Sequence, residues 1–134
     1  ASDDAKLGYS EVKIGFIPAI VSVFLLRKIG ESKTKELLLS GKTLSAKEAV
    51  SVGLINQVVS NDILDDTVQN IAEKLCHQAS GQSLATTKKL IANLQNMSLE
   101  DGLYFAVQEN AKARLNEDCK KGISSFLNKE KINW

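Results

Sequence analysis

The sequence predicts an α/β fold, of which these 134 residues form a predominantly α-helical portion with a few short strands. Two observations support this prediction. Helix-capping signals and amphipathic spacing recur along most of the chain, whereas one short run rich in β-branched residues, 54–59, indicates a strand. A single short strand needs neighbours to be stable, so we expect a sheet supplied by sequence outside these residues.

Composition limits the classes of function. Seventeen basic residues against sixteen acidic ones give a net charge of +1, so no bulk electrostatic attraction favours nucleic acid. Cys76 and Cys119 lack the spacing of a metal site or a disulfide framework, and we expect reduced thiols and no bound metal. The longest apolar stretch, residues 14–26, is interrupted and predicts a buried element, not a membrane span. The chain begins with Ala1, without a signal-peptide pattern, which we interpret as a truncation or cleavage point.

The first third of the chain predicts an extended segment followed by two helices. Residues 5–14 alternate apolar and polar side chains, which is typical of a strand. A proline suits the first position of a helix over residues 18–29. Gly30 can adopt the left-handed backbone conformation that ends such a helix. A second, short helix over residues 31–39 is expected to end at Gly41.

The middle of the chain carries the clearest local signal. Ser45 and Glu48 have the spacing of a capping box, which begins a brief helix expected to end at Gly53. The predicted strand over residues 54–59 follows, and a turn at residues 60–61 closes it.

The second half of the chain predicts only helices. Apolar residues at spacings of three and four line one face of residues 62–79, which is typical of an amphipathic helix. Further helices are expected over residues 82–95, 98–115 and 117–126.

Few residues suggest chemistry by their type and position. The single histidine, His77, lies within the amphipathic helix and is expected to be structural or solvent-exposed. Glu11 differs because it precedes an apolar stretch that ends at Pro18, and a carboxylate held beside apolar walls suits proton transfer. From position alone, an exposed loop acid is the alternative interpretation of Glu11.

Consecutive motifs resemble those of the enoyl-CoA hydratase/isomerase (crotonase) family. Residues 7–18 are similar to the family pattern in which a proline–glutamate pair is followed by glycine and proline. Glu11 takes the place of that glutamate, and Ser10 stands where the family has the proline. The later motifs follow in the family's order, over residues 30–41, 45–49, 53–58 and 118–129. The resemblance covers nearly the whole chain and implies the C-terminal half of the subunit.

This resemblance implies a ClpP/crotonase-like fold whose ββα spiral core is largely missing from these residues. Residues 1–60 would form the C-terminal end of the spiral core with part of the active site, and residues 61–134 a helical trimerisation region. The two backbone N–H groups of the oxyanion hole and a second catalytic glutamate are expected upstream of Ala1. These residues alone are therefore expected to be inactive.

The resemblance also implies roles for residues near the start of the chain. Glu11 would act as a general acid/base, with Ile14, Ile17 and Pro18 in the acyl pocket. Residues 19–24 are bulkier than the glycine pair that the family has after this proline.

At the other end of the chain, the resemblance implies that Phe126 and Lys129 hold the coenzyme A moiety. The alternatives are a core phenylalanine and a solvated lysine at a helix end. Glu130 stands where the family has a basic residue.

The implied activity is reversible addition of water to a 2-enoyl-CoA thioester through an enolate-like transition state. No cofactor is expected, because coenzyme A is part of the substrate. Enoyl-CoA double-bond isomerisation and a non-catalytic helical assembly module of a larger crotonase-like protein are the alternatives. The expected partners are an acyl-CoA thioester and identical subunits in a trimer or a dimer of trimers, with neither nucleic acid nor a membrane. The unpaired cysteines favour the cytoplasm, with the mitochondrial matrix as the alternative.

Overall fold

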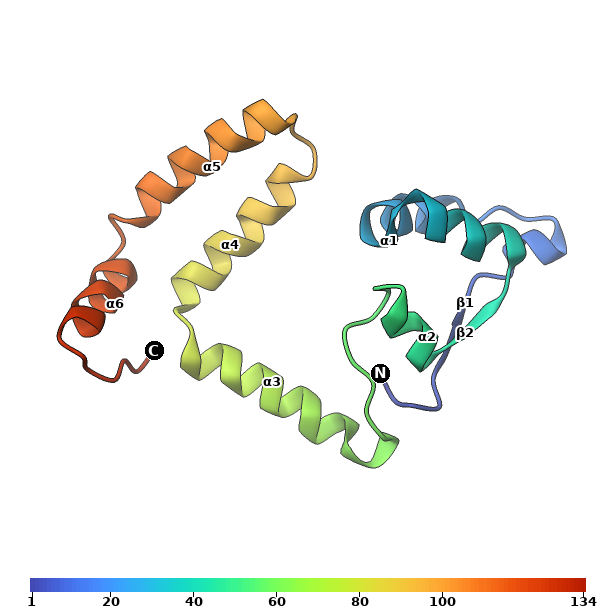
Figure 1. Ribbon diagram of the computed structural model, residues 1–134, viewed down its shortest axis with the longest axis horizontal. Coiled ribbons are helices and arrows are strands. Elements are labelled where there is room, and N and C mark those ends of the chain that lie inside the picture. The colour runs from blue at the N-terminus through green and yellow to red at the C-terminus, as the bar shows by residue number, and fades with distance from the viewer. The chain divides into compact units, whose positions relative to one another are not determined.

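The computed structural model describes every residue from Ala1 to Trp134. The chain forms two units, Ala1–Val68 and Gln69–Trp134 (Figure 1). The first unit contains helices and a two-stranded sheet, and the second is helical. A predominantly helical chain with a few short strands is therefore confirmed. None of the helices combines the length and the apolar character that crossing a membrane requires.

The sheet of the first unit is short and antiparallel. Strand β1 (Lys6–Gly8) pairs with strand β2 (Thr43–Ser45). The strands approach closely at Gly8, where an added Cβ would lie 3.1 Å from the Thr43 Cα atom. A side chain at this position would crowd the opposite strand, so the close approach of the two backbones favours glycine.

The extended segment predicted for residues 5–14 is confirmed only in part. After β1 the chain turns into a 3₁₀ helix, η1 (Glu11–Ile14), in which the Lys13 N–H donates to the Ser10 carbonyl at 2.9 Å. Gly15 ends this turn with a left-handed φ of 75°. Residues 11–14 therefore form local 3₁₀ hydrogen bonds and not the strand pairing that the alternating pattern indicated.

The strand predicted over residues 54–59 is wrong. The N–H groups of Leu54 and Ile55 both donate to the carbonyl of Ala49, at 2.9 and 3.3 Å, so they close the preceding helix. Val59 makes only an isolated bridge with the N-terminal segment. The β-branched composition of this run did not decide its conformation, because strand propensity depends on available neighbours.

Helix α1 (Ala19–Ser40) is interrupted at Gly30, whose φ of 74° and ψ of 171° are not helical. That backbone region is populated almost entirely by glycine. Beyond the break the helix continues to Gly41, whose N–H donates to the Leu37 carbonyl at 3.1 Å. The two helices predicted on either side of Gly30 are confirmed, joined by this break.

Helix α2 (Ala46–Ser51) begins with the predicted capping box. The Glu48 N–H donates to the Ser45 hydroxyl at 3.3 Å, and the Ser45 N–H donates to the Glu48 carboxylate at 2.7 Å. The backbone hydrogen bond from Ser45 is the main cause that lowers the pKa of Glu48. The box fixes the start of α2 immediately after β2.

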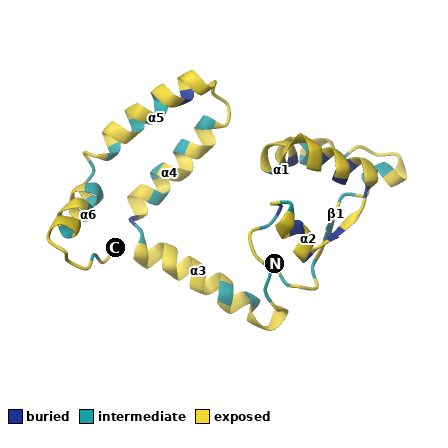
Figure 2. Ribbon diagram, viewed as in Figure 1, coloured by how far each residue is buried: buried dark blue, intermediate teal, exposed yellow.

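The hydrophobic core of the first unit is built from α1, β2, α2 and the segment that follows α2 (Figure 2). Its buried members are Leu25, Leu37, Leu38, Leu44, Ala49 and Leu54. Leu25 and Leu37 lie on opposite sides of the Gly30 break, so the change of helix direction lets both parts of α1 reach one core. This core holds α1 against the sheet and α2.

The remaining helices confirm the predictions for the second half of the chain. They are α3 (Leu64–Gln78), which crosses from the first unit into the second, α4 (Gly81–Leu94), α5 (Leu99–Ala113) and α6 (Glu117–Leu127). His77 is exposed on α3, as expected. Within the second unit, α4 contacts both α5 and α6.

One buried serine links two of these helices. The Ser80 hydroxyl accepts a hydrogen bond from the Ser83 N–H at 3.0 Å and so caps α4. The same hydroxyl donates to the Asp118 carboxylate of α6 at 2.5 Å. A single side chain thus starts one helix and fixes it to another.

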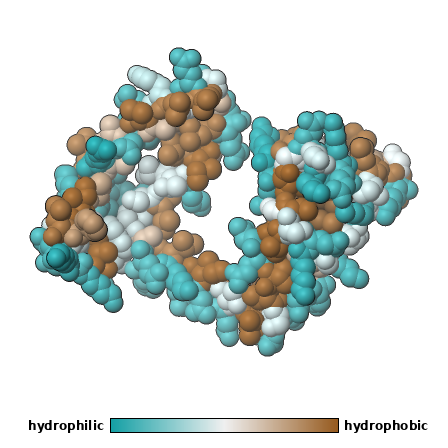
Figure 3. Space-filling view, viewed as in Figure 1, coloured by the Kyte–Doolittle hydropathy of each residue, from teal (hydrophilic) through white to brown (hydrophobic).

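Large apolar side chains remain exposed in both units (Figure 3). In the first unit they include Ile14, Phe16, Ile20 and Phe24. In the second unit they include Leu103, Tyr104, Val107 and Phe126. Contiguous apolar surface is typical of sites that bind a ligand or another protein surface.

Candidate functional site

Glu11 opens the 3₁₀ helix η1, between strand β1 and helix α1. The Phe16 N–H donates to the Glu11 carbonyl at 3.0 Å, which folds the following segment back toward this residue. The side chain is only partly exposed, and its Oε2 atom is buried without a hydrogen-bond partner. Buried carboxylate oxygens are nearly always paired, so an unpaired one points to a role outside the packing of this unit.

An open hollow of about 510 Å³ lies beside Glu11. Its apolar lining includes Phe16, Ile17, Pro18, Ile20, Val21 and Phe24. Glu11 is the only ionisable residue in that lining. A carboxyl group among apolar lining residues is a candidate for proton exchange with a ligand.

The structure brings together three of the four residues predicted for this site. Ile17 and Pro18 line the hollow with Glu11. The Ile14 side chain is 82% exposed and lies outside the lining of that hollow. Phe16, Ile20 and the other apolar lining residues were not singled out from the sequence.

A second open hollow, of about 600 Å³, shares Ile17 and Pro18 with the first. It is also lined by Thr34, which is buried and whose Oγ1 atom has no hydrogen-bond partner. Glu31 and Lys35, which form an ion pair, line it as well. Its charged residues therefore neutralise each other, and Glu11 does not line it.

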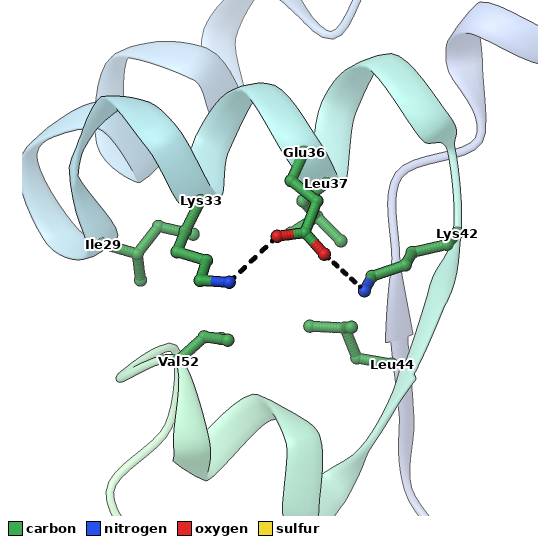
Figure 4. Close-up of a pocket in the computed structure, with 7 residues that line it drawn as sticks. All are labelled: Ile29, Lys33, Glu36, Leu37, Lys42, Leu44 and Val52. Carbon is green, nitrogen blue, oxygen red and sulfur yellow. Dashed lines mark hydrogen bonds and ion pairs between the residues drawn. The ribbon is translucent and has the colours of Figure 1, made fainter.

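A cluster of three charged residues links α1 to the turn that leads into β2 (Figure 4). The Glu36 carboxylate lies 2.8 Å from the Lys42 Nζ atom and 2.9 Å from the Lys33 Nζ atom. Hydrogen bonds from Lys42 and then from Lys33 lower the pKa of Glu36 to about 2. These side chains surround a gap of only about 20 Å³, so the cluster serves to join two elements.

This cluster predicts a pH dependence of stability. Because the pKa of Glu36 is about 2 in the folded protein and 4.5 ordinarily, its ion pairs stabilise the fold above about pH 4.5. That contribution is lost as the pH falls toward 2. Glu36→Gln should therefore lower the unfolding midpoint slightly at pH 7 and not at all near pH 2, in urea titrations across this range. Added salt should reduce the difference, because the pairs are about half exposed, and a difference that persists at pH 2 would contradict the assignment.

The residues predicted to hold coenzyme A lie in the second unit, at the end of α6. Phe126 is 82% exposed. Lys129 has a left-handed φ of 57°, the one such non-glycine residue in the chain. Its N–H donates to the Phe126 carbonyl at 3.2 Å, and the Glu130 N–H donates to the Ser125 carbonyl at 2.9 Å. These two bonds form a Schellman turn, in which glycine is the usual residue at the position of Lys129.

The charged and sulfur-containing residues do not form a metal centre. Nowhere in the chain do three His, Cys, Asp or Glu side chains gather in an arrangement that holds a metal ion. Cys76 is exposed and Cys119 partly exposed, and both are free thiols.

Comparison with known proteins gives consistent matches along the chain. The family model for enoyl-CoA hydratase/isomerase matches residues 1–134. A Thermus thermophilus protein named as an enoyl-CoA hydratase is 42% identical over 127 residues, which are 95% of this chain and 50% of that protein. A Bacillus subtilis protein named in the same way is 33% identical over 133 residues, which are 98% of this chain and 51% of that protein.

Solved structures agree with the sequence matches. The crystal structure of enoyl-CoA hydratase from Mycobacterium smegmatis superimposes with a TM-score of 0.93 and 27% identity, over 100% of this chain and 52% of that one. The chain spans about half the length of the curated relatives it matches. With a family model that matches every residue and a shared fold, the chain belongs to the enoyl-CoA hydratase/isomerase family and has part of the crotonase fold.

Proposed function

We propose that this chain supplies part of the active site of an enoyl-CoA hydratase, in which Glu11 is a general acid/base. The reaction is the reversible addition of water to a 2-enoyl-CoA thioester. The observation that carries the proposal is the buried, unpaired Oε2 atom of Glu11 beside an apolar hollow. Family membership and the names of the relatives support the substrate class.

Hydration places a hydroxyl group on C3 of the acyl chain and a proton on C2. As the water oxygen gives one proton to a general base and bonds to C3, the electron pair of the double bond moves toward the thioester oxygen. C2 then takes one proton from a general acid while the thioester carbonyl re-forms. Glu11 exchanges a proton with the reactants in this sequence, while Ile17 and Pro18 hold the acyl carbons beside its carboxylate. The resemblance to the family implies two N–H donors to the thioester oxygen, each worth on the order of 3 kcal/mol.

An assay with paired substrates tests this function. The complete protein that carries this chain is given either a 2-enoyl-CoA or the matching 3-enoyl-CoA. Hydration of the 2-enoyl thioester supports the proposal. Conversion of the 3-enoyl thioester to its 2-enoyl isomer, without hydration, would replace hydratase activity by isomerase activity. If neither thioester reacted, the remaining hypothesis would be a non-catalytic helical assembly module.

The proposed chemistry needs no cofactor besides the coenzyme A moiety of the substrate. Support comes from the reaction itself, in which a carboxylate and hydrogen-bond donors supply acid/base and electrostatic catalysis. Hydration by the complete protein should therefore survive dialysis against EDTA. Loss of activity that added Mg²⁺ or Zn²⁺ restores would contradict this.

We also propose that Phe126 and Lys129 contact the coenzyme A moiety. A lysine at a position that favours glycine costs stability, on the order of 1 kcal/mol, so its side chain has a use elsewhere. Lys129→Gly should raise the KM for the thioester about tenfold, the effect of losing a typical charge-assisted contact, and raise the unfolding free energy by about 1 kcal/mol.

The matched control for this variant is Lys131→Gly, which removes the same charge two residues further along. Lys131 is exposed and its φ is not positive, so neither the KM nor the stability should change appreciably. If Lys129→Gly gained stability but kept the wild-type KM, Lys129 would be a solvated lysine at a helix end with no contact to coenzyme A. The measurements are steady-state kinetics and denaturant titration of the complete protein.

For assembly, we propose a homotrimer or a dimer of trimers. The exposed apolar side chains of the second unit support it, because apolar surface of this kind is usually covered in an assembly. Light scattering of the complete protein should give three or six times the subunit mass. A monomer at micromolar concentration would contradict the proposal.

The cytoplasm is the compartment we propose, with the mitochondrial matrix as the alternative. Free thiols at Cys76 and Cys119 are typical of reducing compartments. Fractionation of native cells, with the protein followed by antibody, distinguishes the two.

A further inference from the structure

The hollow beside Glu11 has a composition that discriminates between acyl groups. Apart from Glu11, every residue that lines it is apolar. An acyl chain whose C2 and C3 atoms lie at the Glu11 carboxylate would extend over these apolar side chains. The nature of that wall therefore decides which chain ends are accepted.

Ile20 and Phe24 form the part of the wall that belongs to helix α1. They are four residues apart, so they lie on the same face of the helix, one turn from each other. Ile20 is 79% exposed and Phe24 65% exposed in this unit. Both line the hollow, where they can contact a ligand, and neither side chain offers a hydrogen bond.

A carboxylate at the end of the acyl chain would be disfavoured on two grounds. Taking a charged group from water into an apolar site carries a large penalty unless a partner compensates it. The residues of this chain that line the hollow include no cation, and the Glu11 carboxylate would repel a second negative charge. The neighbouring hollow does contain Lys35, but that lysine pairs with Glu31 and lies in a lining that excludes Glu11.

We infer that Ile20 and Phe24 are specificity-determining residues that restrict the substrate to acyl groups with an uncharged, hydrocarbon end. This inference rests on the proposed hydratase function of the same site. It concerns the choice between acyl groups, whereas the proposed function concerns the reaction.

The test compares two six-carbon 2-enoyl-CoA thioesters that differ only at the chain end, one with a methyl group and one with a carboxylate. For the complete wild-type protein, kcat/KM should be on the order of 100-fold higher for the methyl-ended thioester, a discrimination that one misfit group in an apolar pocket can give. Equal values would overturn the inference and leave the proposed function standing. If the protein hydrated neither thioester, the proposed hydratase function itself would be contradicted.

A charge placed in the wall provides the second arm. Phe24→Lys should raise kcat/KM for the carboxylate-ended thioester about tenfold and lower it for the methyl-ended one. The matched control is Leu39→Lys, which adds the same charge to the neighbouring hollow, where Glu11 is absent. The preference should be unchanged in that control. A reversal of preference by Leu39→Lys but not by Phe24→Lys would place the acyl chain in the other hollow and overturn the inference.

Discussion

Replacing Glu11 by glutamine is expected to lower kcat for hydration by about 10²- to 10⁴-fold, the usual contribution of a positioned general acid/base. Glutamine has the shape of glutamate but cannot exchange the proton. The carboxylate oxygen that it replaces has no hydrogen-bond partner within the unit, so the packing loses no contact. Steady-state kinetics and thermal unfolding of the complete protein measure the two effects.

Glu31→Gln is the matched control for this prediction. It makes the same chemical change on an acid of the same unit that pairs with Lys35 and does not line the Glu11 hollow. Its kcat should stay within about twofold of the wild-type value, since an exposed ion pair contributes little. Near-normal turnover of Glu11→Gln would remove the acid/base role of Glu11.

Leu37→Ala is expected to destabilise the protein by about 2–5 kcal/mol, the range for removing a buried leucine side chain. Leu37 is 3% exposed and belongs to the core that unites α1, β2 and α2. Its carbonyl also accepts the hydrogen bond that ends α1 at Gly41. The loss combines transfer of apolar surface with an unfilled cavity, and urea unfolding of the complete protein measures it.

The control at the same position is Leu37→Met, which keeps most of the apolar volume. It should cost less than about 1.5 kcal/mol. If the alanine variant were as stable as the methionine variant, the position would not be part of a packed core.

Local signals in the sequence predicted the helices well because those signals act within a few residues. The breaks at Gly30 and Gly41 follow from the backbone freedom of glycine, and the capping box follows from Ser45 and Glu48 alone. Strand β2 has only three residues, too few for an alternating pattern, and depends on pairing with a distant segment. That pairing is not visible in the local sequence.

The candidate site was predicted in part, for a related reason. The family motif identified Glu11, Ile17 and Pro18, and the structure places all three in the lining of one hollow. The bulk of residues 19–24 near the acyl pocket was recognised, but Ile20 and Phe24 were not singled out, although their spacing on a helix that begins after Pro18 is a usable signal. The unpaired state of the Glu11 Oε2 atom depends on how η1 packs in three dimensions, which no sequence pattern encodes.

Hydration with Glu11 as the general acid/base can be tested by following the atoms of water into the product. The complete wild-type protein and its Glu11→Gln variant are incubated with a 2-enoyl-CoA in water labelled with ¹⁸O and deuterium, and the product is analysed by mass spectrometry and NMR. We expect the wild-type protein to place the labelled oxygen on C3 and deuterium on C2, and the variant to do both about 10²- to 10⁴-fold more slowly. Equal rates of labelling by the two proteins, or no labelled oxygen with the wild-type protein, would contradict this expectation.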